Sequence, residues 1–157
     1  MEIRPLSFTE VDVIWEINEA GLPGTGQVSV DEIKALLEFS SLAVGAYSNK
    51  KLVGFVICLP PKTEYGSLNY SWFNQRYADF LYVDRIAVSV PHQNQKIGTL
   101  LYEYVKRKAR EMRVPVTAEV NIKPPNPGSI RFHERHGFEQ VGILHHEKKS
   151  VALYIFN

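Results

Sequence analysis

A polar loop between a strand pattern and a helix pattern carries the most distinctive chemistry of the chain. The apolar run Phe80–Val88 is followed by the loop His92–Lys96, and an amphipathic pattern begins near Ile97. The start of a helix has backbone N–H groups without partners and a partial positive charge, and both features suit a phosphate. The loop adds side-chain donors and one cation, and Gly98 lets a ligand approach closely. The unit predicts a diphosphate site built on backbone amides.

This unit differs from the two common glycine-rich phosphate motifs. The sequence contains neither G-x-x-x-x-G-K-[ST] nor G-x-G-x-x-G, which excludes a P-loop and a Rossmann fingerprint. A single glycine before a helix also fits a plain strand-to-helix turn. The functional interpretation therefore depends on the elements around the unit.

Two N-terminal helices are predicted from capping-box spacing. Ser7 lies three residues before Glu10, and Ser29 lies three residues before Glu32. Apolar residues at helical spacing follow each pair, which is typical of a helix start. The stretch Gly21–Gly26 contains glycine and proline and is expected to connect the two helices.

Two further helices are predicted in the second half of the chain. Apolar residues on one face and basic residues on the other indicate a helix over Ile97–Arg113. Asn126 followed by proline has the pattern of a helix N-cap, and Gly137 has the pattern of a helix end.

The remaining apolar runs predict a sheet. The connection Lys62–Asp79 is rich in aromatic residues and is expected to be a functional loop. The element order β-α-α-β-β-β-α-β-α-β-β predicts an α+β fold with a mixed, mostly antiparallel central sheet flanked by helices, as a single domain over residues 1–157. The expected strands are Glu2–Leu6, Leu42–Tyr47, Lys51–Leu59, Phe80–Val88, Val114–Ile122, Phe138–Leu144 and Val151–Phe156.

Composition narrows the class of protein. The chain has 157 residues, 45% hydrophobic residues and a net charge of +1, which suits one ordinary globular core and disfavours nucleic acid or a membrane as partner. The longest apolar stretch, Leu52–Leu59, is too short to span a bilayer, and Met1–Leu6 lacks the apolar run of a signal peptide. A single cysteine, Cys58, fits a reducing compartment. We therefore expect a cytoplasmic protein.

Two segments resemble the GNAT superfamily of N-acetyltransferases. The segment RIAVSVPHQNQKIGTLLYEYV is similar to that family's coenzyme-binding motif, Gln/Arg-x-x-Gly-x-Gly/Ala, with Gln93–Gly98 at the motif positions. The segment NPGSIRFHERHGFEQVG is similar to the family pattern Asn-x-x-Ser/Ala-x-x-Phe-Tyr-x-x-x-Gly-Phe. It is matched by Asn126, Ser129, Phe132, Gly137 and Phe138. The two segments cover about the second half of the chain, and the strand order also matches the family.

The resemblance implies an acyltransferase that moves an acetyl group from acetyl-coenzyme A (acetyl-CoA) to an amine of a small molecule or peptide. It implies that the strand end Ile86, Ala87 and Val88 pairs with the pantetheine arm. It implies a diphosphate site at Gln93, Asn94, Gln95, Lys96, Ile97, Gly98 and Thr99, and a far wall formed by Asn126, Ser129, Phe132 and His133. Lys96 replaces the first glycine of the motif, and His133 replaces a tyrosine that often protonates the leaving thiolate.

Asp84 and His133 are the candidate catalytic residues. An alkylammonium substrate must lose a proton before it attacks a thioester, and Asp84 could attract the cation and accept that proton. The alternative is an ion pair with a nearby arginine. His133 could protonate the thiolate or donate a hydrogen bond to the sulfur. The alternative is a helix histidine that only touches the coenzyme.

The aromatic connection is the candidate acceptor wall. Tyr70, Trp72 and Phe73 could contact the substrate there, although such clusters are more often core. We expect no metal, because the pair His133 and His136 lacks cysteine or carboxylate partners. Cys58 lies in an apolar strand, so an inert thiol and direct attack of the amine in a ternary complex are favoured.

Two other classes of protein are compatible with parts of the sequence. A non-catalytic GNAT-fold module could hold coenzyme A as a sensor or structural ligand, given the changes at Lys96 and His133. A nucleic-acid binder that uses the basic helix face is disfavoured by the near-zero net charge. The acceptor amine and the acyl-chain length are open, and so is a homodimer.

Overall fold

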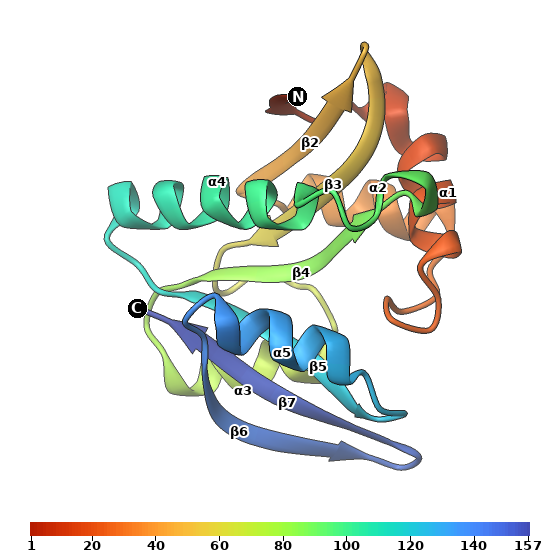
Figure 1. Cartoon of the computed structure of the whole chain (residues 1–157). Coiled ribbons are helices and arrows are strands. Elements are labelled where there is room, and N and C mark those ends of the chain that lie inside the picture. The colour runs from red at the N-terminus through yellow and green to blue at the C-terminus, as the bar shows by residue number, and fades with distance from the viewer.

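The computed structural model describes residues 1–157 as one seven-stranded sheet with helices on both faces (Figure 1). The strand order is β1-β2-β3-β4-β5-β7-β6, and every neighbouring pair is antiparallel except β4 and β5. The strands are β1 (Glu2–Pro5), β2 (Leu42–Ser48), β3 (Lys51–Leu59), β4 (Leu81–Val88), β5 (Val116–Lys123), β6 (Glu139–His146) and β7 (Lys149–Phe156). The helices are α1 (Val11–Ala20), α2 (Val30–Phe39), α3 (Leu68–Arg76), α4 (Ile97–Met112) and α5 (Pro127–Arg135). The expected α+β fold is confirmed.

Both predicted capping boxes are present. Ser7 donates its backbone N–H to Glu10, which caps a short 3-10 turn that leads into α1. The Ser29 hydroxyl accepts from the backbone N–H of Glu32, and the Glu32 carboxylate accepts from Ser29 in return. These reciprocal bonds satisfy donors that have no partner inside a helix, so the two helices start where the sequence predicts.

The sheet separates two hydrophobic layers. Along β3, Phe55 and Ile57 face the layer with α1, α2 and α3, whereas Val56 and Cys58 face the layer with α4. Side chains alternate along a strand, so one apolar run supplies both layers. Burial raises the pKa of the Cys58 thiol. A protonated, buried thiol is a poor nucleophile.

The connection Lys62–Asp79 is not a continuous loop. Leu68–Arg76 forms α3, whose first turn is capped by the Ser67 hydroxyl accepting from the N–H of Tyr70. The prediction of a loop is wrong here because the apolar residues of this segment form no helical stripe. Helix α3 adds one element to the expected order.

Strands β4 and β5 diverge and open a fork in the sheet (Figure 1). Their parallel pairing consists of Leu81 with Val116 and Tyr82 with Thr117. Beyond these pairs β4 continues beside β3, and β5 continues beside β7. Backbone groups on the inner edges of the fork therefore lack strand partners and are available to a ligand. None of the five helices is long and apolar enough to cross a bilayer.

Candidate active site

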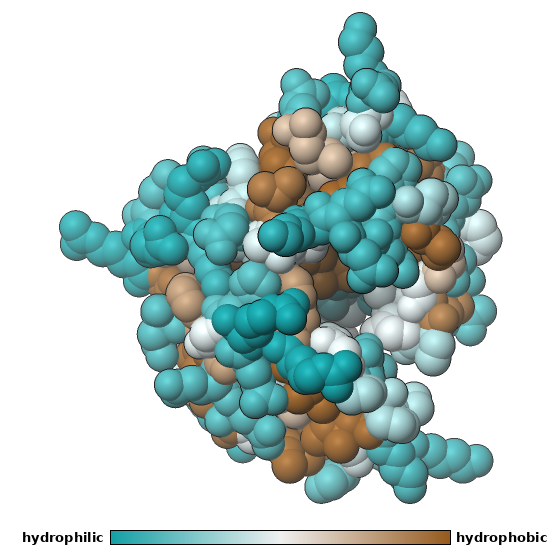
Figure 2. All heavy atoms as spheres, in the orientation of Figure 1, coloured by the Kyte–Doolittle hydropathy of each residue, from teal (hydrophilic) through white to brown (hydrophobic).

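Two adjoining cavities occupy the fork, and Ile86 and Ser129 line both. The larger, of about 540 Å³, lies between the loop before α4 and the helix α5. The smaller, of about 240 Å³, lies deeper between β4, β5 and the α1–α2 connection. We call them the loop cavity and the polar cavity. Figure 2 shows this region as a hollow in the surface. Such adjoining spaces suit two substrates that must meet.

The loop cavity is bordered by the uncapped start of α4. Lys96 precedes the helix in a left-handed conformation with φ of 63°, and no side chain caps the first turn. An added Cβ at Gly98 would meet only the ring of Phe132, at 3.6 Å. Protein packing alone would therefore accept alanine here, and the glycine keeps the helix start open. The amides at this position suit the binding of an anion.

Most of the predicted coenzyme residues lie around the loop cavity. Gln95 is absent from its lining, and Asn126 and His133 line the polar cavity instead. His92, the first residue of the predicted loop, also lines the loop cavity, and so does Arg135, which the sequence analysis did not name. Arg135 follows Phe132 by three residues on α5, so helical spacing could have revealed it. The predicted residues found in the lining are Ile86, Ala87, Val88, Gln93, Asn94, Lys96, Ile97, Gly98, Thr99, Ser129 and Phe132.

Asp84 lines the polar cavity as part of an ion pair. Its carboxylate lies 2.9 Å from Nε of Arg85, and the Asp84 side chain is only 3% exposed. Arg85 also donates to the side chain of Asn18 and to the carbonyl of Gly26, each at 3.1 Å. Burial opposes the charge of Arg85, but Asp84 and Tyr65 together outweigh burial, and the pKa of Arg85 is raised. The pair anchors the α1–α2 connection beside the cavity.

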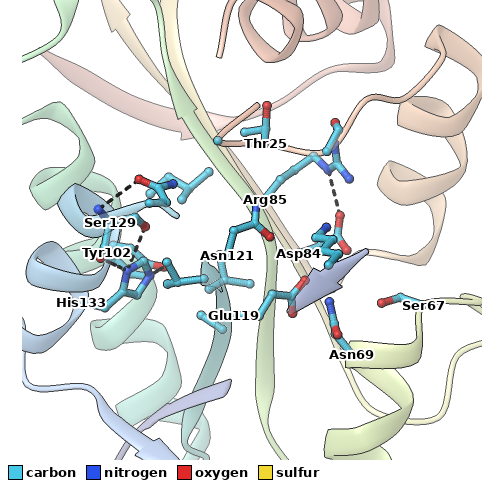
Figure 3. A pocket seen from close by; sticks show the side chains of 18 of the residues that line it. Thr25, Ser67, Asn69, Asp84, Arg85, Tyr102, Glu119, Asn121, Ser129 and His133 are labelled. Atoms are coloured by element: carbon cyan, nitrogen blue, oxygen red, sulfur yellow. Dashed lines mark hydrogen bonds and ion pairs between the residues drawn. The ribbon is translucent and has the colours of Figure 1, made fainter. Parts of the chain in front are cut away.

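Glu119 on β5 is a functional candidate that the sequence analysis missed. Its carboxylate lines the polar cavity (Figure 3). It accepts a 2.6 Å hydrogen bond from the hydroxyl of Tyr82. Burial and the charge of Asp84 raise the pKa of Glu119 to about 7, against hydrogen bonds from Tyr82 and Asn69 that lower it. A carboxylate with a pKa near neutrality is well matched to general-base chemistry.

His133 also lines the polar cavity, and both of its ring nitrogens have partners. Nδ1 lies 2.8 Å from the carbonyl oxygen of Ser129, so Nδ1 carries the hydrogen. Nε2 lies 2.7 Å from the hydroxyl of Tyr102 and accepts from it. Burial lowers the pKa of His133. The neutral ring therefore presents no free N–H to a leaving thiolate, and its contacts join α5 to α4.

The three predicted acceptor aromatics lie outside the polar cavity. Tyr70 and Phe73 belong to α3, and their side chains are buried in the core. Trp72 packs against Gly142, where an added Cβ would lie 2.6 Å from the indole. The guanidinium of Arg76 lies over the ring of Trp72. The same segment instead contributes Tyr65, Ser67 and Asn69 to the cavity. The surface that this segment turns toward the cavity is thus more polar than the aromatic residues of the sequence suggested.

With this geometry in place, comparison with known proteins identifies the family. The model of the acetyltransferase (GNAT) family matches residues 12–138, and this chain belongs to that family. Over 116 residues, 74% of this chain, it is 30% identical to "Probable N-acetyltransferase san" of Drosophila melanogaster. The match spans 56% of the Drosophila protein. Membership confirms the family expected from the two sequence segments.

Solved structures share the fold across the whole chain. Ard1 from Thermoplasma volcanium superposes with a TM-score of 0.79 at 16% identity, covering 99% of this chain and 95% of that one. Arabidopsis thaliana NAA60 in complex with a bisubstrate analogue gives 0.77 at 16% identity, covering 99% and 96%. The ribosomal-protein-S18-alanine N-acetyltransferase of Escherichia coli gives 0.76 at 17% identity, covering 98% and 91%. At these levels of sequence identity, the structural similarity is evidence for a shared fold alone.

Proposed function

We propose that this protein transfers an acetyl group from acetyl-CoA to an amine of a peptide or small molecule, with Glu119 as general base. The observation that carries the proposal is a carboxyl group of near-neutral pKa in a polar cavity that adjoins the cavity of the coenzyme motif. Family membership supports the reaction class. The non-catalytic alternative gives no reason for a proton acceptor at this position.

Acetyl-CoA would enter through the loop cavity. The amides at the start of α4 suit its diphosphate, and Lys96 and Arg135 add positive charge around the same opening. The unpaired inner edge of β4 can hydrogen-bond the amides of the pantetheine arm. This arrangement directs the thioester from the loop cavity toward the polar cavity.

The acceptor amine would enter the polar cavity as an ammonium ion. Glu119 removes one proton, and the amine nitrogen then forms a bond to the thioester carbonyl carbon. Collapse of the tetrahedral intermediate breaks the carbon–sulfur bond, and the nitrogen gives its second proton to water. The coenzyme leaves as a thiolate that takes a proton from water, and Glu119 releases the first proton to solvent. A thiol has a pKa of about 8.5, so its thiolate leaves without much acid assistance. That chemistry agrees with a neutral His133 whose nitrogens are occupied.

We infer that the residue bearing the amine is small or polar. Ser67, Asn69 and Asn121 line the cavity together with the charged groups. A large apolar side chain placed there would leave polar groups without hydrogen-bond partners, at a cost of about 1–3 kcal/mol for each group. The Escherichia coli neighbour is named as a ribosomal-protein-S18-alanine N-acetyltransferase, and alanine is compatible with this acceptor class.

The test is amine-dependent release of coenzyme A thiol with a panel of small amines and peptides. Glu119→Gln is expected to lower kcat/KM at pH 7 by about 100-fold or more, since general-base catalysis contributes about 10²–10⁴. Binding of coenzyme A to this variant should be unchanged. Asp84→Asn serves as a comparison, because Asp84 lies in the same cavity but is paired with Arg85. Coenzyme binding without thiol release for any amine would favour the non-catalytic module, and full activity of Glu119→Gln would reject the base.

A further inference from the structure

The hairpin of β6 and β7 borders the polar cavity at Lys149, and the neighbouring His146 contacts the cavity wall. Nε2 of His146, the last residue of β6, lies 3.0 Å from Oδ1 of Asn69 on α3. The neighbouring His145 points to the opposite face and pairs with the Ser150 hydroxyl at 2.8 Å in an exposed position. Two adjacent histidines thus have different surroundings, and only His146 contacts a residue that lines the cavity.

The contact with His146 fixes which way the Asn69 amide points. An amide oxygen only accepts hydrogen bonds, so Nε2 of His146 must be the donor to Oδ1. The Asn69 side chain is therefore held with its nitrogen toward the cavity, and Figure 3 shows that nitrogen on the side of the Glu119 carboxylate. A donor in this direction favours the charged form of Glu119 and lowers its pKa. Asn69 is only 8% exposed, so water competes weakly at this position.

We propose that His146 is a positioning residue for Glu119 and that it acts through Asn69. Without the histidine, the Asn69 oxygen loses the donor that holds the amide in this orientation. Rotation by half a turn would present the Asn69 oxygen to the carboxylate and replace an attraction with a repulsion. This role rests on the proposed function of Glu119 as the base.

The influence of other nearby groups on the pKa of Glu119 must be distinguished from the influence of His146. Tyr82 and Asp84 face it from β4, and Lys149 faces it from β7. Tyr82 and Asp84 lie on β4, which does not pair with β6 or β7, so a change at His146 should leave their backbone in place. Lys149 shares the hairpin with His146 and could move with it. His145→Ala is the matched control, because it alters the same hairpin on the other face.

The experiment is a carbon-13 NMR titration of the Glu119 carboxyl group, assigned by comparison with Glu119→Gln. We expect His146→Ala to raise the pKa of Glu119 by about one unit, since one hydrogen bond to a charged group is lost. Asn69→Ala should give the same shift, and the double variant no more than either one. His146→Gln supplies an uncharged N–H donor and should restore most of the original value. His145→Ala should leave it unchanged.

The pH profile of kcat/KM gives a second measurement. In His146→Ala, the acidic limb of the profile should shift by the same amount as the Glu119 pKa measured by NMR. In His145→Ala, the acidic limb should stay in place. An unmoved carboxyl pKa in a folded His146→Ala protein, or an equal shift in His145→Ala, would overturn the role of His146. If the carboxyl pKa moves as expected but Glu119→Gln retains full activity, the positioning contact stands and the assignment of the base fails. The two ideas are thus rejected by different results.

Discussion

The hydroxyl of Tyr82 lies 2.6 Å from Oε2 of Glu119, across the point where β4 and β5 separate. Tyr82 belongs to the last registered pair of the two strands, and Glu119 lies two residues beyond its partner Thr117. The hydrogen bond therefore spans the base of the fork. It also stabilises the charged form of a carboxyl group that burial would otherwise keep protonated.

Removal of this hydroxyl should shift the pH dependence of the reaction upward. In Tyr82→Phe the carboxylate of Glu119 loses a donor, so its pKa should rise above its value of about 7 by about one unit. Activity at pH 7 should fall several-fold and recover near pH 9. The measurement is kcat/KM between pH 5.5 and pH 9.5. A uniform loss at every pH would indicate a damaged cavity instead.

Glu119 should also make the protein less stable at alkaline pH. Its pKa is raised from 4.5 in the unfolded chain to about 7 in the folded protein, so folding favours the protonated form. This effect is absent below pH 4.5, and stability is lost as the pH rises from 4.5 through 7. Glu119→Gln should therefore add about 1–3 kcal/mol to the free energy of unfolding at pH 8 and little at pH 4. Urea unfolding at the two pH values measures this difference.

His133 should contribute more to stability than to the chemical step. His133→Phe preserves the ring but leaves the Tyr102 hydroxyl and the Ser129 carbonyl without their present partner. We expect the free energy of unfolding to fall by about 1–3 kcal/mol and kcat to change by less than about tenfold. A loss of more than about 100-fold in kcat with unchanged KM would instead support the acid role expected from the sequence.

Lys96 should carry both a conformational cost and an electrostatic benefit. Its φ of 63° lies in the left-handed region, which costs a residue with a side chain about 1 kcal/mol or more. Lys96→Gly should raise Tm by about 2–4 °C. The same change should weaken acetyl-CoA binding and reduce its dependence on salt. Lys96→Ala separates the two effects, because it removes the charge and keeps the strained conformation. Equal Tm values for Lys96→Gly and Lys96→Ala would contradict the strain.

Local patterns in the sequence predicted most of the fold, because they act over three or four residues. The capping boxes at Ser7 and Ser29 and the stripe along α4 each specify an element without reference to the rest of the chain. Helix α3 was missed because tertiary contacts of Tyr70 and Phe73 hold it, rather than an apolar stripe. Its N-cap Ser67 was the available local signal.

The candidate site was less predictable than the fold for a geometric reason. Glu119 is a polar residue between apolar ones in a strand pattern. In the sequence, such a residue resembles an ordinary side chain on the solvent-facing side of a sheet. Only the divergence of β4 from β5 turns that position toward a cavity, and two residue pairs determine where it begins. Asp84 was easier to single out, because it precedes the coenzyme motif on the same strand. The sequence, however, could not show that Arg85 pairs with it in the fold.

The fork also links ligand binding to the cohesion of the molecule. Leu81 with Val116 and Tyr82 with Thr117 are the strand pairs that join one half of the sheet to the other. A co-substrate lying between the inner edges would take the place of the missing backbone pairing and tie the halves together. Ligands that bind only the folded state stabilise it in proportion to the logarithm of their concentration. The metabolic supply of the acyl donor would then govern how long each copy of the enzyme survives, as well as how fast it works.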